Sequence, residues 1–124
     1  YVPDIRPYLS DAACFIAPLR VGGGTRLKIL DAWASGKAVV STARGCEGLE
    51  TVHGTNILIA DDARGFAQAM QRVIDDPALR ASLGRAARQT VERRYSWEGI
   101  GRELCSVYSD VRANWKNGRL SRSA

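Results

Sequence analysis

The amino-acid sequence predicts an α/β fold, namely part of a doubly wound parallel sheet with flanking helices. Two short apolar runs, residues 13–19 and 37–42, have the pattern of strands buried on both faces, which is typical of parallel sheets. A helical pattern between them opens at Thr25 and stops at Gly36. Strand, crossover helix and strand together form a βαβ unit, with an expected right-handed crossover.

The rest of the chain continues this alternation. A third strand is expected at residues 56–60, and Asp61 or Asp62 can cap the helix that follows. Pro77 suits the first turn of another helix, and Ser96 suits the cap of the last one. That last helix carries an apolar stripe, which we expect to dock on this domain or on a partner: Trp97, Ile100, Leu104, Val107, Val111 and Trp115.

Three buried strands are fewer than the roughly five of a complete doubly wound sheet. We therefore expect residues 1–115 to form the second half of such a domain, with a polar basic tail at residues 116–124. The chain has 124 residues and opens without an initiator Met, which indicates a fragment. Its exposed sheet edge and uncovered apolar surface lead us to expect self-association.

Composition excludes some classes and leaves others open. The three cysteines are widely spaced, with no CxxC motif, so neither a disulfide framework nor a zinc site is expected. No run reaches the roughly 18 apolar residues that a membrane span needs. The net charge of +5 suits anionic ligands, membrane surfaces or nucleic acid without choosing among them.

A glycine triplet between the first strand and its helix is the main chemical feature. Gly22, Gly23 and Gly24 would let an anion approach the backbone, and the free N–H groups of the next helical turn would point towards it. Arg26 and Lys28 add positive charge there. The triplet matches no established phosphate-loop motif, so a plain flexible turn is the alternative.

Asp31 is the second feature, nearly two turns into the same predicted helix. It shares a mostly apolar face with Leu27, Leu30 and Ala34. A carboxylate that faces the strand ends could accept hydrogen bonds from the two hydroxyls of a ribose. A solvated helix position is the equal alternative.

These features occur together in one run, APLRVGGGTRLKILDAWASGKAVVSTARGCEGL. The run resembles the donor-binding segment of family-four retaining glycosyltransferases, which have the GT-B fold with its Rossmann-like domains. GTNILIADDARGFAQAM and RYSW resemble later parts of the same domain. The resemblance covers nearly the whole chain, and Ala38 replaces the usual proline before the second strand.

The resemblance implies roles for particular residues. The donor diphosphate of a nucleotide sugar would be bound, largely through the backbone, by Gly22, Gly23, Gly24, Thr25, Arg26, Leu27 and Lys28. Asp31 stands where the family has the second of two glutamates, the one that binds the ribose. Gly23 stands where many members have the first, which contacts the transferred sugar, so this chain departs from the pattern there.

The resemblance also implies parts that lie outside this chain. The acceptor-binding N-terminal domain and the usual Arg and Lys beside the donor phosphate would precede Tyr1. We therefore expect no catalytic residue here, no metal or other cofactor, and little turnover by the chain alone. The complete enzyme would be cytoplasmic or peripheral at the inner face of a membrane, and would assemble a polysaccharide or glycolipid.

Other residues carry weaker hypotheses. Glu47 lies in the loop after the second strand, where it could contact the donor, whereas His53 has no catalytic partner at a recognisable spacing. Basic residues cluster on a later helix and in the tail, and a solvated face is the plain interpretation. They are Arg80, Arg85, Arg88, Arg93, Arg94, Arg112, Lys116, Arg119 and Arg122.

Two alternatives to the enzyme remain open. A non-catalytic nucleotide-binding or self-associating module is favoured by the missing first glutamate at Gly23. A basic domain that binds anionic lipid or nucleic acid is supported only by charge. Nucleic acid is the weaker of these, because the aromatic residues follow the apolar stripe and do not alternate with the basic ones.

Overall fold

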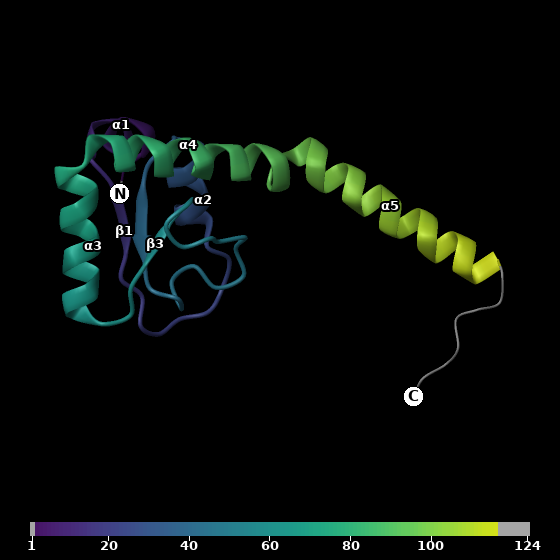
Figure 1. The fold of residues 1–124 in the computed structure, drawn as a ribbon. Coiled ribbons are helices and arrows are strands. Elements are labelled where there is room, and N and C mark those ends of the chain that lie inside the picture. The colour runs from purple at the N-terminus through teal and green to yellow at the C-terminus, as the bar shows by residue number, and fades with distance from the viewer. Residues whose placement is uncertain (1, 117–124) are drawn as a thin grey trace. The chain divides into compact units, whose positions relative to one another are not determined.

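A computed structural model describes residues 2–116 of the chain. The polar tail at 116–124, with Arg119 and Arg122, lies outside this range apart from position 116. The chain divides into two units, residues 1–92 and 93–124. The elements, in order, are α1 (Arg6–Asp11), β1 (Phe15–Ala17), α2 (Leu27–Ala34), β2 (Val39–Ser41), β3 (Leu58–Ile59), α3 (Ala63–Asp75), α4 (Pro77–Arg94) and α5 (Trp97–Lys116) (Figure 1).

The three strands form one parallel sheet in the order β1-β2-β3. Phe15 stands opposite Val39, and Val40 stands opposite Leu58. This confirms the predicted parallel α/β sheet, with α2 connecting β1 to β2. The strands are shorter than the apolar runs that predicted them, because the run ends belong to the connecting loops.

The prediction that both strands are buried on both faces is confirmed for β2 and is wrong for β1. All three residues of β2 are buried, whereas Ile16 in β1 keeps 41% of its surface exposed. The reason is position in the sheet. β2 has a strand on each side, while β1 is an edge strand of the sheet formed by the described residues. An apolar run alone does not distinguish these two places.

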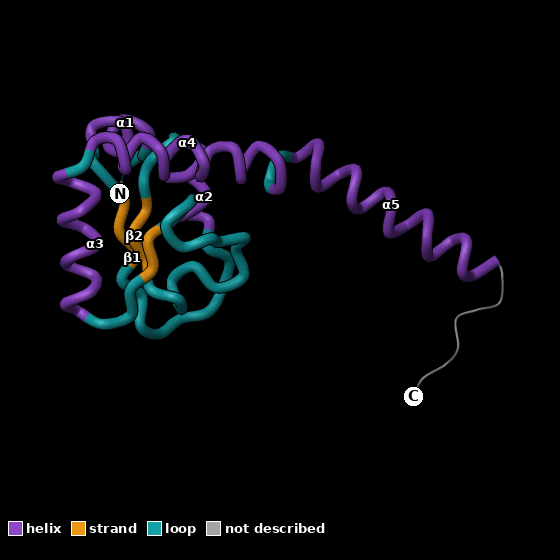
Figure 2. The backbone as a smooth tube through the Cα atoms, in the orientation of Figure 1, coloured by secondary structure: helices purple, strands orange, loops and turns teal. Residues whose placement is uncertain are grey.

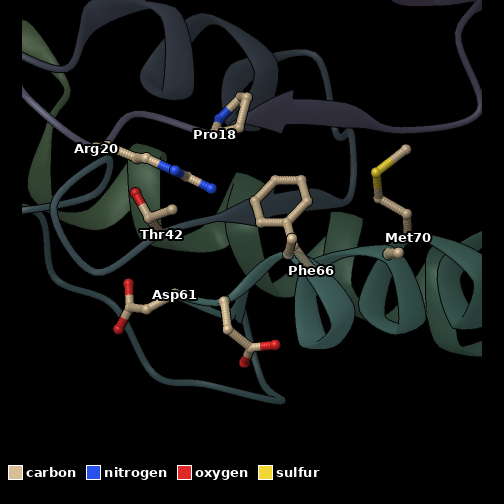
Figure 3. A pocket seen from close by; sticks show the side chains of 9 residues that line it. Pro18, Arg20, Thr42, Asp61, Phe66 and Met70 are labelled. Atoms are coloured by element: carbon tan, nitrogen blue, oxygen red, sulfur yellow. The ribbon is translucent and has the colours of Figure 1, made fainter.

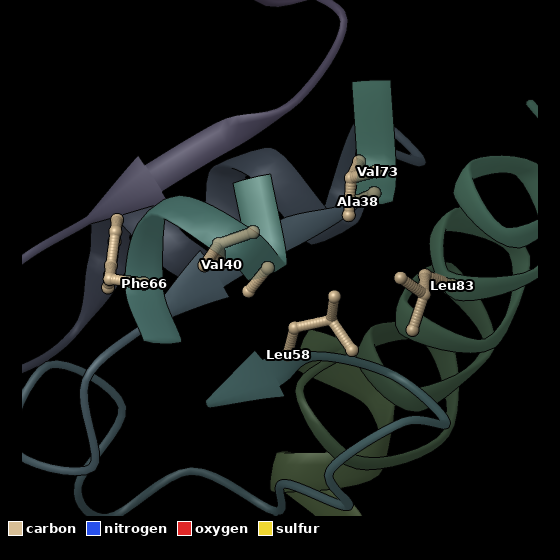
Figure 4. Packing of buried hydrophobic residues seen from close by; sticks show 7 residues of the cluster. Ala38, Val40, Leu58, Phe66, Val73 and Leu83 are labelled. Atoms are coloured by element: carbon tan, nitrogen blue, oxygen red, sulfur yellow. The ribbon is translucent and has the colours of Figure 1, made fainter. Parts of the chain in front are cut away.

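Helices cover both faces of the sheet, with α2 on one side and α3 on the other (Figures 1 and 2). Val39 and Val40 point to opposite faces because side chains alternate along a strand. On the α3 side, Val40 and Leu58 pack against residues from α3 and α4 (Figure 4). The buried members of this cluster are Ala38, Val40, Leu58, Phe66, Ala69, Val73 and Leu83.

The helix α2 differs from its predicted form in two ways. It begins at Leu27, two residues later than expected, because Arg26 has a non-helical backbone (φ −84°, ψ 45°). Its buried face consists of Ile29, Ala32 and Trp33, so the stripe that contains Leu27 and Asp31 faces outwards. The predicted stop at Gly36 is confirmed, since this glycine has a positive φ of 67°.

The predicted helix signals later in the chain are confirmed. The Asp62 carboxylate accepts a hydrogen bond from the Gly65 amide and caps α3, and Pro77 opens α4. The Ser96 hydroxyl accepts from the Gly99 amide at the start of α5. The short helix α1 was not anticipated, since six residues give too little periodicity to be recognised.

A glycine in α4 sets how closely this helix packs beside β2. A Cβ atom at Gly84 would overlap the carbonyl oxygen of Gly36 and would lie 3.7 Å from the Ala38 nitrogen. Gly36 and Ala38 precede β2, so α4 packs at the amino-terminal end of that strand. Only a residue without a side chain allows this contact.

We predict that Gly84→Ala destabilises the protein by about 1–3 kcal/mol, because the added methyl group displaces backbone rather than a flexible side chain. Gly101→Ala in α5 is the matched control, since nothing lies within 4 Å of a Cβ there. Alanine there should be neutral or stabilising by up to about 1 kcal/mol. Urea unfolding measures both variants, and equal stabilisation by the two would contradict the close contact.

The second unit contains α5 and its apolar stripe. The stripe is exposed along its length, from Trp97 (87%) to Trp115 (75%). An exposed stripe of this kind is consistent with docking on a partner, but nothing in the structure tests which one. Docking and self-association therefore stay predictions.

Candidate functional site

The loops that leave the carboxyl ends of the parallel strands form the candidate site. β1 leads through Pro18 and Leu19 into the glycine loop, residues 20–26, and then into α2. β2 leads into a second loop, residues 42–50, and β3 leads into Asp61 and α3. In open α/β sheets ligands bind at this edge.

Thr42 ties the first two loops together. Its hydroxyl donates a hydrogen bond to the Leu19 carbonyl and accepts one from the Gly45 amide at 2.9 Å. Gly45 must lack a side chain, because a Cβ would lie 2.7 Å from the Ala17 carbonyl oxygen and would overlap the Ser41 hydroxyl. The loops after β1 and β2 therefore form one continuous surface.

Two of the three loop glycines need their special backbone freedom. Gly22 has φ 139° and Gly24 has φ 97°, a region that other residues rarely adopt, whereas Gly23 does not. A Cβ at any of the three would meet nothing within 4 Å, so the loop is open. A ligand can therefore reach the backbone of this loop.

The first turn of α2 completes an anion-binding arrangement. No side chain caps this helix end, and the Ile29 amide already donates to the Arg26 carbonyl at 3.0 Å. The amides of Leu27 and Lys28 belong to the turn that has no intrahelical partner. The helix dipole and the exposed Lys28 side chain favour an anion at this end.

Arg26 is placed differently from Lys28. Its side chain is only 8% exposed, and Nη2 donates to the carbonyls of Gly22 (3.3 Å) and Arg44 (2.8 Å). The same nitrogen lies 3.7 Å from the Glu47 carboxylate. The Arg26 guanidinium thus clamps the glycine loop to the second loop, and its Nε is buried without a partner.

Glu47 lies on the outer side of this clamp. Its carboxylate pairs with Arg44 at 2.7 Å and with Arg26, and it remains exposed. The hydrogen bond from Arg44 holds the pKa of Glu47 below its ordinary value. The structure thus brings Glu47 close to the glycine loop, while its predicted donor contact stays untested.

Asp31 lies on the exposed face of α2, opposite its buried residues. It lines a hollow of about 450 Å³ together with Ile5, Leu9 and Arg88. Lys28 and Asp31 are three positions apart, so they are neighbours on one helix face, and the Asp31 Cβ is tilted towards the open helix end. The predicted contact of Asp31 with a ribose stays a prediction.

The structural roles of three polar residues in this region were not anticipated from the sequence. Thr42 and Asp61 join separate segments, since the Asp61 carboxylate accepts from the Ala43 amide at 2.8 Å. His53 accepts from the Ile59 amide through Nδ1 at 2.9 Å, which gives it a structural role. Thr42 and Asp61 lie one and two residues after β2 and β3, and a polar residue at such a position was the available signal.

Some of the clustered arginines also have structural partners. Arg80 donates to the carbonyls of Val73 and Ile74, both at 3.0 Å, at the end of α3. Arg88 pairs with Glu92 and donates to the Ala34 carbonyl at the end of α2. Cations placed at helix carboxyl ends satisfy their free carbonyl groups and favour the helix dipole.

The described part of the chain contains neither a candidate metal site nor a candidate membrane span. Residues 2–116 contain no group of three His, Cys, Asp or Glu side chains that could hold a metal ion. Within the same residues, no helix has both the length and the apolar character needed to cross a membrane. The expectation that no metal takes part stays a prediction.

Comparison with known proteins gives the family. The profile of a family described as "Glycosyl transferases group 1" matches residues 1–76, which is more than half of the chain. The chain belongs to the group 1 glycosyl transferases. The matched segment contains the whole candidate site, from the glycine loop to Asp61. No solved structure matches the chain significantly.

Individual relatives of this domain are glycosyltransferases with different names. A lipopolysaccharide core biosynthesis glycosyltransferase of Rhizobium meliloti is 34% identical over 78% of the chain, which spans 29% of that protein. A D-inositol 3-phosphate glycosyltransferase of Nocardioides is 35% identical over 82% of the chain. A GDP-mannose-dependent mannosyltransferase of Corynebacterium glutamicum is 28% identical over 84%. The chain thus spans less than a third of each relative's length.

We predict that Arg26→Met loosens the glycine loop and lowers the free energy of unfolding by about 1–3 kcal/mol, because two hydrogen bonds from a charged, largely buried side chain are lost. Arg44→Met removes only an exposed ion pair with Glu47 and should cost less than about 1 kcal/mol. Urea unfolding gives the energies, and amide exchange at residues 22–24 reports the loop. Similar losses in both variants would contradict the clamp.

Proposed function

We propose that this domain binds the diphosphate and ribose of a nucleotide-sugar donor for a glycosyltransferase. The observation that carries the proposal is the open loop with positive-φ Gly22 and Gly24, which leads directly into the uncapped first turn of α2. The amides of Leu27 and Lys28 and the Lys28 side chain would donate to phosphate oxygens. Asp31, one turn further along, would accept from the ribose hydroxyls.

The side chain of Arg26 would have a different task in this proposal. Its guanidinium is already engaged with two carbonyl groups, so it positions the glycine loop before a ligand arrives. A preorganised loop binds an anion without a cost for ordering it.

The reaction proposed for the complete enzyme moves a glycosyl group from the nucleotide diphosphate to an acceptor hydroxyl. The donor's C–O bond to the diphosphate breaks, and a new bond to the acceptor oxygen forms while the acceptor loses its proton. The leaving diphosphate gains negative charge, which the α2 amides and Lys28 would stabilise. Because the chain spans less than a third of its relatives, we propose that the chain alone has little turnover.

We predict that the chain binds uridine or guanosine diphosphate in isothermal titration calorimetry, and that Lys28→Glu and Asp31→Ala each weaken binding about tenfold or more, because each removes a charged contact. Arg85→Glu is the charge-matched control for Lys28→Glu, since Arg85 is exposed on α4. It should leave the dissociation constant unchanged. An absence of binding, or equal weakening by Arg85→Glu, would contradict the proposed site.

A further inference from the structure

A cavity of about 320 Å³ lies beside the candidate site, on the α3 side of the sheet. It is lined mainly by Pro18, Arg20, Thr42, Asp61, Phe66 and Met70 (Figure 3). Its volume falls at the lower end of the roughly 300–1,000 Å³ that is usual for small-molecule sites. The residues of the proposed diphosphate and ribose site do not line it, so it needs a separate explanation.

Two charged side chains at this cavity are available to a ligand. Asp61 accepts from the Ala43 amide through Oδ1, which fixes the carboxylate and leaves its second oxygen available. Within residues 2–116, Arg20 forms no ion pair and no side-chain hydrogen bond, and it is exposed. Figure 3 shows Arg20 extending towards the ring of Phe66, with Thr42 between Arg20 and Asp61.

The balance of charge at the cavity disfavours an anion. Arg20 supplies one positive charge, whereas Asp61 and Asp62 supply two negative ones. Asp62 is engaged as the cap of α3, so it adds charge without a free direction for binding. A phosphate group would meet net repulsion here, whereas a neutral ligand would not.

The walls of the cavity fit a ligand with both polar and apolar surface. Pro18, Phe66 and Met70 provide an apolar wall, and Figure 3 shows Met70 beyond the Phe66 ring as seen from Arg20. A pyranose ring presents C–H groups on its faces and hydroxyls around its edge. The hydroxyls can donate to the Asp61 carboxylate and accept from the Arg20 guanidinium.

The cavity is also close to the proposed diphosphate site. Arg20 precedes Gly22 by two residues, so their Cα atoms are at most about 7 Å apart. The Thr42 hydroxyl further ties the second loop to Leu19, next to Arg20. A ligand in the cavity would therefore lie next to a diphosphate on the glycine loop.

We propose that this cavity binds a hexopyranosyl unit, with Asp61 and Arg20 contacting its hydroxyls and Phe66 and Met70 contacting its C–H face. The inference rests on the proposed glycosyltransferase function and adds a sugar-binding subsite to it. The unit could belong to the donor or to the acceptor, which share this chemistry. Gly23 contributes no side chain for sugar recognition, so this chain needs other polar groups for that task.

Met70 gives a direct probe of the cavity, because it is the only methionine of the chain. We predict that the ¹³C-methyl resonance of labelled Met70 shifts on titration with methyl hexopyranosides or with nucleotide sugars. Asp61→Asn keeps an acceptor for the Ala43 amide but loses the charge, and should weaken this binding about tenfold, as should Arg20→Met. Asp75→Asn, at the far end of α3, and Arg85→Met, on α4, are the controls that keep wild-type affinity.

Titrations with different ligands distinguish whether the bound sugar belongs to the donor or to the acceptor. A shift with nucleotide sugar but not with nucleoside diphosphate assigns the cavity to the donor's sugar. A shift with glycoside that persists while nucleotide sugar is bound assigns it to the acceptor. The inference is overturned if no glycoside or nucleotide sugar shifts Met70, if nucleoside diphosphate alone shifts it, or if Asp61→Asn and Arg20→Met bind like wild type.

Failure of this inference can be told from failure of the proposed function. The amides of residues 22–24 report diphosphate binding in the same samples. If these amides shift while the Met70 methyl resonance stays in place, the sugar subsite is wrong and the nucleotide site stands. Well-dispersed amide spectra of the variants show that they remain folded.

Discussion

The hydroxyl group of Thr42 is the contact on which the geometry of this site depends. It donates to the loop that follows β1 and accepts from the loop that follows β2, so one buried side chain fixes both. Gly45 makes this contact feasible, because any side chain there would displace the backbone of β1. The short parallel strands supply the frame, but this junction brings their carboxyl ends into a single binding surface.

On that surface, the base of the glycine loop is held by hydrogen bonds, whereas the rest of the loop is open. Arg26 holds the base of the glycine loop through two carbonyl groups, while Gly22, Gly23 and Gly24 leave the rest uncovered. The positive charge that would meet a ligand comes from Lys28 and from the helix end instead. This division explains why two basic residues in one turn have such different exposure.

Most of the fold could be predicted because its signals are local. Apolar runs marked the three strands, and Gly36, Asp62, Pro77 and Ser96 marked helix ends through hydrogen bonds or backbone angles that involve only near neighbours. The exposure of Ile16 could not be predicted in this way. It depends on which strand lies at the sheet edge, and that is a property of the whole assembly.

The site was predictable to a lesser degree for the same reason. The glycine loop and Lys28 are visible as a motif, but the clamp by Arg26 depends on Arg44, eighteen residues later. Asp61 likewise acts on Ala43 across the sheet edge. Contacts between loops of different strands leave no periodic trace in a sequence, so the cavity between Arg20, Asp61 and Phe66 appears only in three dimensions.

In the proposed function, the start of α2 and the glycine loop hold the donor diphosphate. A crystal structure of the chain with a nucleoside diphosphate tests it most directly. We expect phosphate oxygens within about 3.2 Å of the amide nitrogens of Leu27 and Lys28, with Arg26 still bound to the carbonyls of Gly22 and Arg44. A diphosphate bound away from residues 22–28 would contradict it.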